Sequence, residues 1–346
     1  MTEIKSVSVL GGGSFGTAIA KVLSENGYSV TWWMRNPEQA EEIRTRRENS
    51  RYHPGVILNE RINPVTDIGY AIGSADLVFV VIPSKAFRDT IRAAAHHFRP
   101  DQMVVSNTKG IEREGFRLMS EVLREELPDV RVGVLSGPNL AGELVQREIT
   151  ASVIASKDLR LREAVQEVLG NEYFRIYANV DVYGVELGGA LKNIYAVVSG
   201  LAAALGMGEN TKAMLLTRSL AEMSRFAVSM GANPMTFLGL SGVGDLMVTC
   251  TSSLSRNYRI GYAIGQGKDL EEAIEELGQV AEGVRTLELV HEKAEELGIY
   301  MPLVRGLYEI LYNRASIRDV VSALMGAAQN SDVEFILPRQ EEASSI

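Results

Sequence analysis

The sequence predicts an α/β protein in which a Rossmann-like, doubly wound sheet comes first and a mostly α-helical part follows. Three observations support this fold class. A β-type apolar run at 7–10 leads directly into a glycine-rich turn and then a helical pattern. From residue 6 to about 180, strand-like and helical segments alternate, which is typical of parallel strands joined by right-handed crossovers. Beyond Asp181 strand signals vanish, and helical patterns continue nearly to Ala328.

The turn at 11–16 has the pattern G-x-G-x-x-G between a strand and a helix. Gly11 allows the chain to turn sharply, Gly13 leaves room for a pyrophosphate, and Gly16 lets the helix pack close to the strand. The helix start offers free N–H groups and a partial positive charge to phosphates. The pattern predicts a dinucleotide site, and an ordinary glycine-rich turn is the alternative.

The second expected strand, at 28–34, bears on which dinucleotide binds. NAD-specific sites usually carry Asp or Glu about 20 residues past the glycines, to bind the ribose 2′-OH. This chain has Arg35 there, and a guanidinium can pair with a 2′-phosphate. We therefore expect NADPH to be used at least as well as NADH. The alternative is that Arg35 stacks on the adenine or lies in solvent.

Further strands are expected in order along the first part of the chain. The run 77–82 is continuously apolar, as in a strand buried on both faces, and a helix follows it to about His97. Four more strands are expected at 103–106, 131–135, 151–155 and 174–177. Ligands bind at the carboxyl ends of such strands. Pro83, Lys109 and residues 137–139 should therefore share one rim with the glycine turn.

This organisation predicts three segments. Residues 1–180 form a dinucleotide-binding Rossmann domain, and residues 181–330 form a helical domain for the substrate and catalysis. Residues 331–346 form a tail that is polar at its end and is expected to fray.

Composition excludes several classes of protein. The chain has 346 residues and a net charge of −9, which argues against a nucleic-acid partner. The single Cys250 excludes an internal disulfide and suits a reducing cytoplasm, and no signal peptide is expected before the first strand. No histidine or cysteine cluster has metal-ligand spacing, so no metal is expected. The most apolar stretch, 194–207, is interrupted by Ser199 and Gly200; it is expected to be a buried helix, too short for membrane insertion.

The start of the second part carries candidate chemistry. Gly188 and Gly189 lie in an expected helix, where each costs about 1 kcal/mol relative to Ala. Close approach by a ligand or another helix is the usual reason for such glycines. Lys192 lies on the same helical face, where a partly desolvated lysine can act as acid or base. The alternative is an ordinary solvated lysine.

Two later segments add polar groups. Asp245 follows a glycine-rich turn, where it could orient Lys192, bind a substrate hydroxyl or simply cap the next helix. Residues 255–257, Ser-Arg-Asn, suit a phosphate, with Arg256 supplying paired charged donors. Cys250 has no histidine near it in sequence and is expected to be a buried structural thiol.

Together these segments resemble the soluble, bacterial-type NAD(P)-dependent sn-glycerol-3-phosphate dehydrogenase family. The glycine turn alone is common to many dehydrogenases, whereas the Lys192 helix combined with Ser-Arg-Asn at 255–257 is specific. The likeness spans about residues 5–330 in the family's order; the matching segments are 11–18, 107–112, 136–143, 184–193, 240–246, 255–257 and 280–284.

The resemblance implies reversible reduction of dihydroxyacetone phosphate to sn-glycerol 3-phosphate, a step of glycerophospholipid biosynthesis, with NADP(H) and/or NAD(H). It implies that Lys192 is the acid/base, with Lys109 and Asp245 beside the substrate. Gly137, Asn139, Ser255, Arg256 and Asn257 would contact the substrate; Gly11, Gly13, Ser14, Phe15, Gly16, Arg35, Lys109, Ala141, Arg256, Val280 and Glu282 would line the cofactor. Two positions depart from the family pattern or vary within it: many bacterial members have Ser or Thr at the place of Asn139, and the Arg35 position varies.

Two other functions stay open. One is a related dehydrogenase for a β-hydroxy acid or a phosphorylated sugar acid, which would want a basic pair near Lys192. The other is a non-catalytic dinucleotide sensor, which would not need Lys192, Asp245 and Arg256 together. The sequence also leaves open feedback inhibition, the direction of flux, and the oligomeric state, for which a homodimer is one option.

Overall fold

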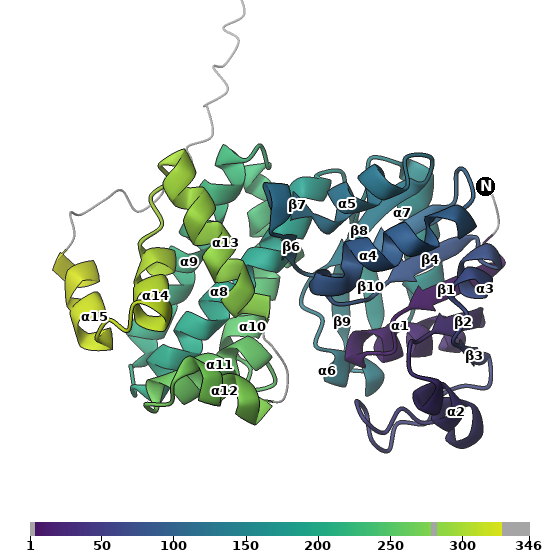
Figure 1. Cartoon of the computed structure of the whole chain (residues 1–346), viewed down its shortest axis with the longest axis horizontal. Helices are drawn as coiled ribbons and strands as arrows, with labels where there is room; N and C mark the ends of the chain where they lie inside the picture. Colours follow the sequence, from purple (N-terminus) through teal and green to yellow (C-terminus); the bar gives the residue numbers. More distant parts are fainter. Residues whose placement is uncertain (1–3, 278–281, 327–346) are drawn as a thin grey trace, which may run out of the picture.

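The structure is a computed structural model that describes residues 4–277 and 282–326. An α/β part up to residue 180, here called the sheet part, lies beside an all-helical part, here called the helical part (Figure 1). An eight-stranded sheet has the order β10-β9-β8-β5-β4-β1-β2-β3. The strands are β1 Ser6–Leu10, β2 Ser29–Trp33, β3 Ile62–Val65, β4 Leu77–Val80, β5 Met103–Ser106, β8 Arg131–Ser136, β9 Thr150–Ala155 and β10 Phe174–Asn179.

Helices cover both faces of this sheet, because strand side chains alternate between two apolar layers. In β4, Leu77 and Phe79 face one layer, whereas Val78 and Val80 face the other. The first layer receives α1 Ser14–Glu25, α2 Pro37–Arg46, α6 Ala141–Val145 and α7 Leu159–Leu169, and the second α3 Ile68–Gly73, α4 Ser84–Ala94 and α5 Met119–Glu126. The doubly wound sheet expected from the sequence is confirmed.

One part of that expectation is wrong, because the sheet is not wholly parallel. β9 pairs antiparallel with β8, and β10 runs parallel to β9. A parallel crossover usually needs a full helix to carry the chain back across the sheet. Between Ser136 and Thr150 the chain forms only the short helix α6, so it returns in the opposite direction.

The expected strand at 103–106 is observed with those bounds, and the others differ by a few residues at their ends. Strand β3, whose four residues include Asn63 and Pro64, was not expected from the sequence. Nor was the hairpin of β6 Ile111–Glu112 and β7 Arg117–Leu118, which lies next to the helical part (Figure 1).

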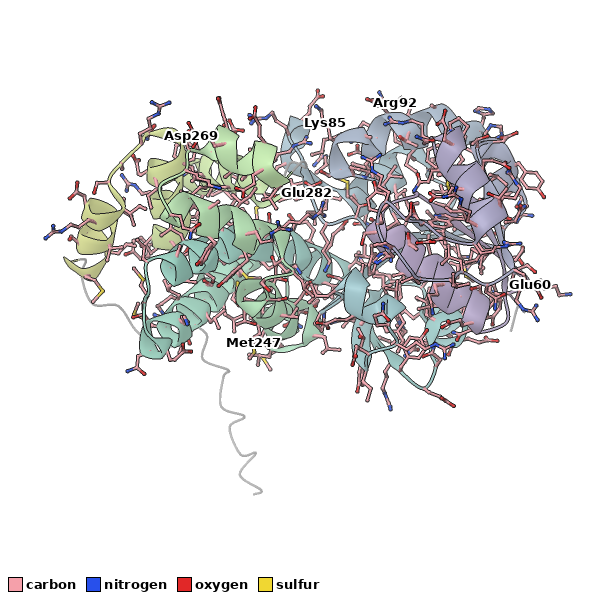
Figure 2. All side chains as sticks on the ribbon, turned by 90° about the horizontal axis from the view of Figure 1, so that it is seen from below. Glu60, Lys85, Arg92, Met247, Asp269 and Glu282 are labelled. Atoms are coloured by element: carbon pink, nitrogen blue, oxygen red, sulfur yellow. The ribbon has the colours of Figure 1, made fainter. Side chains whose placement is uncertain are left out.

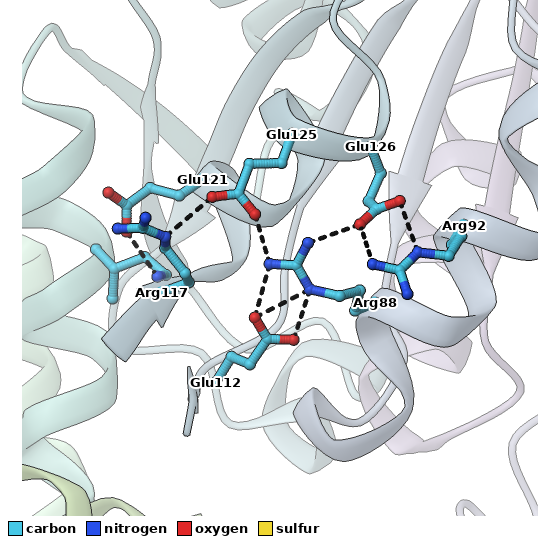
Figure 3. Close-up of polar contacts among 8 residues, drawn as sticks. Arg88, Arg92, Glu112, Arg117, Glu121, Glu125 and Glu126 are labelled. Atoms are coloured by element: carbon cyan, nitrogen blue, oxygen red, sulfur yellow. Dashed lines mark hydrogen bonds and ion pairs between the residues drawn. The ribbon is translucent and has the colours of Figure 1, made fainter. Parts of the chain in front are cut away.

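An ion-pair network joins this hairpin to helices α4 and α5 of the sheet part (Figure 3). Arg88 of α4 donates to Glu112 of β6 at 2.7 Å. The same guanidinium reaches Glu125 and Glu126 of α5, each at 2.6 Å. Arg92, one turn further along α4, shares Glu126 at 2.8 Å. The network therefore fixes the chain directly after the loop that carries Lys109.

The helical part is built around the long helix α8, Val182–Ala204. Its first turn packs on the sheet through Val182 and Val185, and the rest lies inside the helical core. The other helices are α9 Glu209–Ser229, α10 Asp245–Thr251, α11 Arg256–Gly265, α12 Leu270–Leu277, α13 Glu282–Leu297, α14 Pro302–Tyr312 and α15 Ile317–Gly326, with short helical turns at Ala95–His97, Glu114–Phe116, Pro234–Leu238 and Leu240–Gly244.

α8 corrects the expectation for the most apolar stretch. The helix has 23 residues and begins well before residue 194, so by length and composition it could cross a membrane. However, 78% of its most apolar window is buried inside the protein, as in a core helix. The expectation of a buried helix is therefore confirmed, whereas the argument that it is too short is wrong.

Candidate active site

The glycine turn has the geometry that its pattern predicts. Gly11 has φ +130°, and a Cβ there would lie 2.3 Å from the Val81 carbonyl oxygen. A Cβ on Gly16 would lie 2.0 Å from the Gly11 oxygen, so helix and strand are in close contact. A Cβ on Gly13 would meet nothing within 4 Å. The open side at Gly13, next to the start of α1, therefore fits the pyrophosphate of a dinucleotide.

The other expected cofactor residues of the sheet part lie around this turn. Ser14 and Phe15 form the first turn of α1, and Phe15 packs against the apolar layer. Ala141 begins α6, which packs against α1. Arg35 lies exposed two residues beyond the end of β2. All four side chains thus come from segments at the carboxyl ends of strands.

Lys192 is buried on α8 and faces a polar cluster. Its ammonium donates to the Asp245 carboxylate and, at 2.5 Å, to the Thr249 hydroxyl. Lys109, from the loop after β5, donates to the other Asp245 oxygen at 2.7 Å and to the Gly137 carbonyl at 3.1 Å. One fully buried carboxylate therefore joins two lysines that are far apart in the sequence.

Burial changes the acidity of this lysine. Desolvation lowers the pKa of Lys192 to about 7, although the Asp245 carboxylate acts in the opposite direction. An ammonium has three N–H donors, and among the described residues two are taken by Asp245 and Thr249. One donor therefore remains for a ligand. Lysine with a pKa near neutrality suits acid–base chemistry.

The two glycines of α8 explain how Lys192 reaches this position. A Cβ on Gly189 would lie 2.6 Å from the Ser136 hydroxyl at the end of β8. A Cβ on Gly188 would lie 2.8 Å from the Ser241 carbonyl in the turn before Asp245. Because these two residues have no side chain, α8 can approach the end of β8 and the turn before Asp245. The close approach expected at these glycines is therefore made to these two segments and not to a single neighbouring helix.

Several buried polar atoms on this rim lack a partner in the described structure. They are both amide atoms of Asn107, the Ser136 hydroxyl and the Asn139 amide nitrogen. Asn139 uses its carbonyl oxygen to accept from Ser152 at 2.5 Å. Unpaired buried polar groups are costly and uncommon, so such a group of them indicates a place for a polar ligand. Sequence reasoning missed Asn107 and Ser136, although Asn107 directly follows β5 and Ser136 ends β8 on the expected rim.

The segment 255–257 is placed at the start of α11. The Ser255 side chain caps this helix by accepting from the Tyr258 amide at 3.3 Å, and Arg256 is its first residue. Asn257 makes two protein contacts: it donates one N–H to Asn193 at 2.9 Å and accepts from the Gly283 amide at 3.0 Å. Asn193, directly after Lys192, is a further residue that sequence reasoning did not single out.

Glu282 begins α13 where the two parts meet (Figure 2). Both its carboxylate oxygens accept from the Ser84 hydroxyl of α4, at 3.0 and 2.9 Å. Burial raises the pKa of Glu282, and Ser84 opposes this by lowering it. Val280, also expected at the cofactor, lies outside the described residues, as does the segment 331–346.

No group of histidine, cysteine and acidic side chains within the described ranges could hold a metal ion. Cys250 is buried, as expected, and burial raises the pKa of its thiol to about 12, which keeps it protonated.

The chain matches one protein family in both of its parts. Residues 6–162 match the family described as "NAD-dependent glycerol-3-phosphate dehydrogenase N-terminus", and residues 181–322 match the corresponding C-terminus. The chain belongs to the NAD-dependent glycerol-3-phosphate dehydrogenase family. The resemblance seen in the sequence is thereby confirmed.

Relatives in this family are similar over almost their whole length. Glycerol-3-phosphate dehydrogenase [NAD(P)+] of Azotobacter vinelandii is 58% identical over 336 residues, which are 97% of this chain and 98% of the relative. The enzyme of the same name from Ectopseudomonas mendocina is 56% identical over the same shares.

Solved structures of the family have the same fold. Glycerol-3-phosphate dehydrogenase of Coxiella burnetii superposes with a TM-score of 0.89 at 35% identity, covering 93% of this chain and 99% of that one. The Saccharomyces cerevisiae enzyme gives 0.83 at 29% identity, covering 92% and 99%. A ketopantoate reductase from Ralstonia eutropha gives 0.56 at 16% identity, which shows a shared fold alone.

Proposed function

We propose that this chain catalyses the reversible, NAD(P)H-dependent reduction of dihydroxyacetone phosphate to sn-glycerol 3-phosphate. The observation that carries the proposal is the ammonium of Lys192, buried and held by Asp245 and Thr249 with one donor left over. Family membership supports the substrate and the cofactor.

Lys192 acts as the proton donor. A nicotinamide held by the sheet part would supply hydride to C2 of the substrate, and negative charge would then develop on the C2 oxygen. The free N–H of Lys192 stabilises that oxygen and donates its proton, leaving a neutral amine. In the reverse direction the neutral amine takes the proton of the C2 hydroxyl.

Asp245 and Lys109 set the position and charge of this group. The Asp245 carboxylate holds the two lysines on opposite oxygens, at 2.7 Å for Lys109. Lys109 is partly exposed, with 23% of its side chain accessible, so it can also contact the substrate. The Thr249 hydroxyl donates to the Asp245 backbone carbonyl at 2.6 Å, and it can therefore only accept from Lys192.

The start of α11 binds the substrate phosphate. Arg256 provides paired charged donors, and the helix N-terminus adds free N–H groups and a partial positive charge. Gly137, Asn139 and the Ser255–Asn257 segment complete the contacts. Because the phosphate is remote from C2, its binding energy aligns the carbonyl with Lys192.

The glycine turn with Ser14 and Phe15 binds the pyrophosphate side of the dinucleotide, and Arg35 binds the 2′-phosphate of NADP(H). Ala141, Val280 and Glu282 line the remainder of the cofactor. We assign residues 1–180 to cofactor binding and 181–330 to substrate binding and catalysis. The net charge of −9 leaves no nucleic-acid partner to expect, and the enzyme acts in the cytoplasm without membrane insertion, either alone or as a homodimer.

Cofactor oxidation measured at 340 nm tests the reaction. Dihydroxyacetone phosphate should support turnover with NADPH and NADH, whereas unphosphorylated dihydroxyacetone and ketopantoate should support little. A chain that turned over ketopantoate faster than dihydroxyacetone phosphate would favour the β-hydroxy acid alternative. Binding of NADPH without turnover of any of these compounds would favour the sensor.

A further inference from the structure

Side chains from the segment between β2 and β3 contact the glycine turn at Gly12 and Ser14. Gln39 donates to the Gly12 carbonyl at 2.6 Å, and the fully buried Asn49 donates to the same oxygen at 3.2 Å. His53 contacts Ser14, two residues after Gly12. Its Nε2 lies 3.0 Å from the Ser14 carbonyl oxygen and 2.9 Å from the Ser14 hydroxyl.

These two contacts determine where the hydrogens lie. The Ser14 carbonyl oxygen can only accept, so Nε2 of His53 must carry the hydrogen. The same N–H then also points at the Ser14 hydroxyl oxygen, which accepts it. The hydroxyl keeps its own hydrogen, which is free to donate to another group.

That free donor lies at the start of α1, where the helix has unpaired N–H groups and a partial positive charge. We propose that His53 is a positioning residue for the dinucleotide pyrophosphate: its Nε2–H holds Ser14 so that the Ser14 hydroxyl donates to a phosphate oxygen. This inference rests on the proposed function, because it assigns a residue to that same cofactor site.

The contacts to Gly12 also orient a hydrogen-bond donor of the glycine turn, the N–H of Gly13. A peptide unit is planar and trans, so its C=O and the following N–H point to opposite sides. Gln39 and Asn49 hold the Gly12 carbonyl on one side, and the N–H of Gly13 is therefore directed to the other. A Cβ on Gly13 would meet nothing within 4 Å, so that residue borders open space.

His53 serves as a neutral donor in this arrangement. The residue is 7% exposed, and burial lowers the pKa of its imidazole, while the contact with Ser14 opposes this. Its role is thus one of hydrogen-bond geometry at neutral pH. A side chain that keeps a donor at the Nε2 position should replace it, whereas an apolar side chain of similar size should not.

Titration of the full-length protein with NADPH, followed by cofactor fluorescence at pH 8, tests the proposal. H53Q keeps an N–H near the Nε2 position and should bind NADPH within about threefold of the wild type. H53L should bind about three- to tenfold more weakly, the range of one net hydrogen bond. Adenosine 2′-phosphate, which has no pyrophosphate, should compete equally well in all three proteins.

A double-mutant comparison separates positioning from mere support of the fold. In an S14A background, adding H53L should weaken NADPH binding much less than it does in the wild type. Two results would overturn the proposal. One is that H53L weakens the binding of NADPH and of adenosine 2′-phosphate equally; the other is that H53L weakens NADPH binding in the S14A background as much as in the wild type. A wild type that binds neither NADPH nor NADH would instead refute the proposed function.

Discussion

At the scale of single residues, the charge, orientation and acidity of the Lys192 ammonium depend on different features of its surroundings. Asp245 keeps it charged, Thr249 fixes the direction of one N–H, and burial makes the proton easier to release. A lysine exposed on the surface would have none of these constraints. The chemistry therefore depends on the surroundings of the side chain as much as on its type.

Replacing Lys192 with alanine should reduce kcat for dihydroxyacetone phosphate by about 10²- to 10⁴-fold, the usual contribution of general acid–base catalysis. NADPH binding should change little, because the glycine turn is untouched. Steady-state kinetics and fluorescence titration measure the two effects. Lys157, which is exposed on the sheet part, offers a matched control in K157A. A loss of kcat smaller than about tenfold would exclude Lys192 as the proton donor.

The pKa of Lys192 predicts opposite pH profiles for the two directions. Reduction needs the protonated lysine, so its kcat should fall as pH rises through about 7. Oxidation of glycerol 3-phosphate needs the neutral amine, so its kcat should rise over the same range. Initial rates in both directions from pH 5.5 to 9 check this. Two profiles that bend the same way near pH 7 would contradict it.

Arg35→Asp should reverse the preference between cofactors. The Asp carboxylate accepts hydrogen bonds from the ribose hydroxyls and repels a 2′-phosphate. Loss of a charge-assisted hydrogen bond of about 1.5–3 kcal/mol should lower kcat/KM for NADPH by about one to two decades. Arg160→Asp, an exposed arginine on α7, is the control. If the wild type strongly prefers NADH, Arg35 does not bind the phosphate.

At the scale of elements, two glycines govern how the helical part packs. A Cβ on Gly200 of α8 would lie 1.9 Å from the Tyr258 carbonyl, and one on Gly261 of α11 would lie 1.9 Å from the Val197 carbonyl. The backbones of the two helices are therefore in direct contact. This contact places the start of α11, with Arg256, relative to Lys192.

Gly261→Ala should lower the free energy of unfolding by about 1–3 kcal/mol or more, because the added methyl overpacks the crossing. Urea unfolding followed by circular dichroism measures the change. Gly73→Ala is the matched control, since nothing lies within 4 Å of a Cβ there; it should be neutral or slightly stabilising. Similar unfolding curves for both variants would mean that α8 and α11 are not in close backbone contact.

The sequence predicts those elements whose patterns are local. The apolar run of β5 and the strand–glycine–helix pattern of α1 are of this kind. The antiparallel pairing of β8 with β9 is not, because it depends on the path of the chain after Ser136. Likewise, the paired glycines identify Lys192, whereas the contact of His53 with Ser14 joins residues 39 positions apart and leaves no periodic signal.

At the scale of the whole molecule, Glu186 of α8 joins the two parts. It accepts from the Ser120 amide at the start of α5 at 2.9 Å, while its other oxygen has no partner in the described structure. Burial raises the pKa of Glu186 from 4.5 to about 7, although the contact with Ser120 lowers it. The folded protein therefore holds this proton over a range where the unfolded chain releases it.

The contribution of protonated Glu186 to the free energy of unfolding should be fully present below pH 4.5 and lost as pH rises to about 7. Glu186→Gln stays neutral, so relative to the wild type it should gain about 1–3 kcal/mol of unfolding free energy between pH 4.5 and pH 8. Urea unfolding at both pH values measures this gain, with the exposed Glu163→Gln as control. A constant difference between wild type and E186Q at both pH values would show that Glu186 ionises normally.

Within residues 4–277 and 282–326, the ion pairs between the two parts have the same polarity. In the described chain, the cations Lys109 and Arg113 come from the sheet part, and their partners Asp245, Glu288 and Glu292 come from the helical part. Acid that protonates these carboxylates thus removes negative charge from the helical part, whereas Lys109 and Arg113 of the sheet part stay positively charged. Small-angle X-ray scattering during acid titration should then show the radius of gyration growing, as the parts separate, before circular dichroism shows any loss of helix.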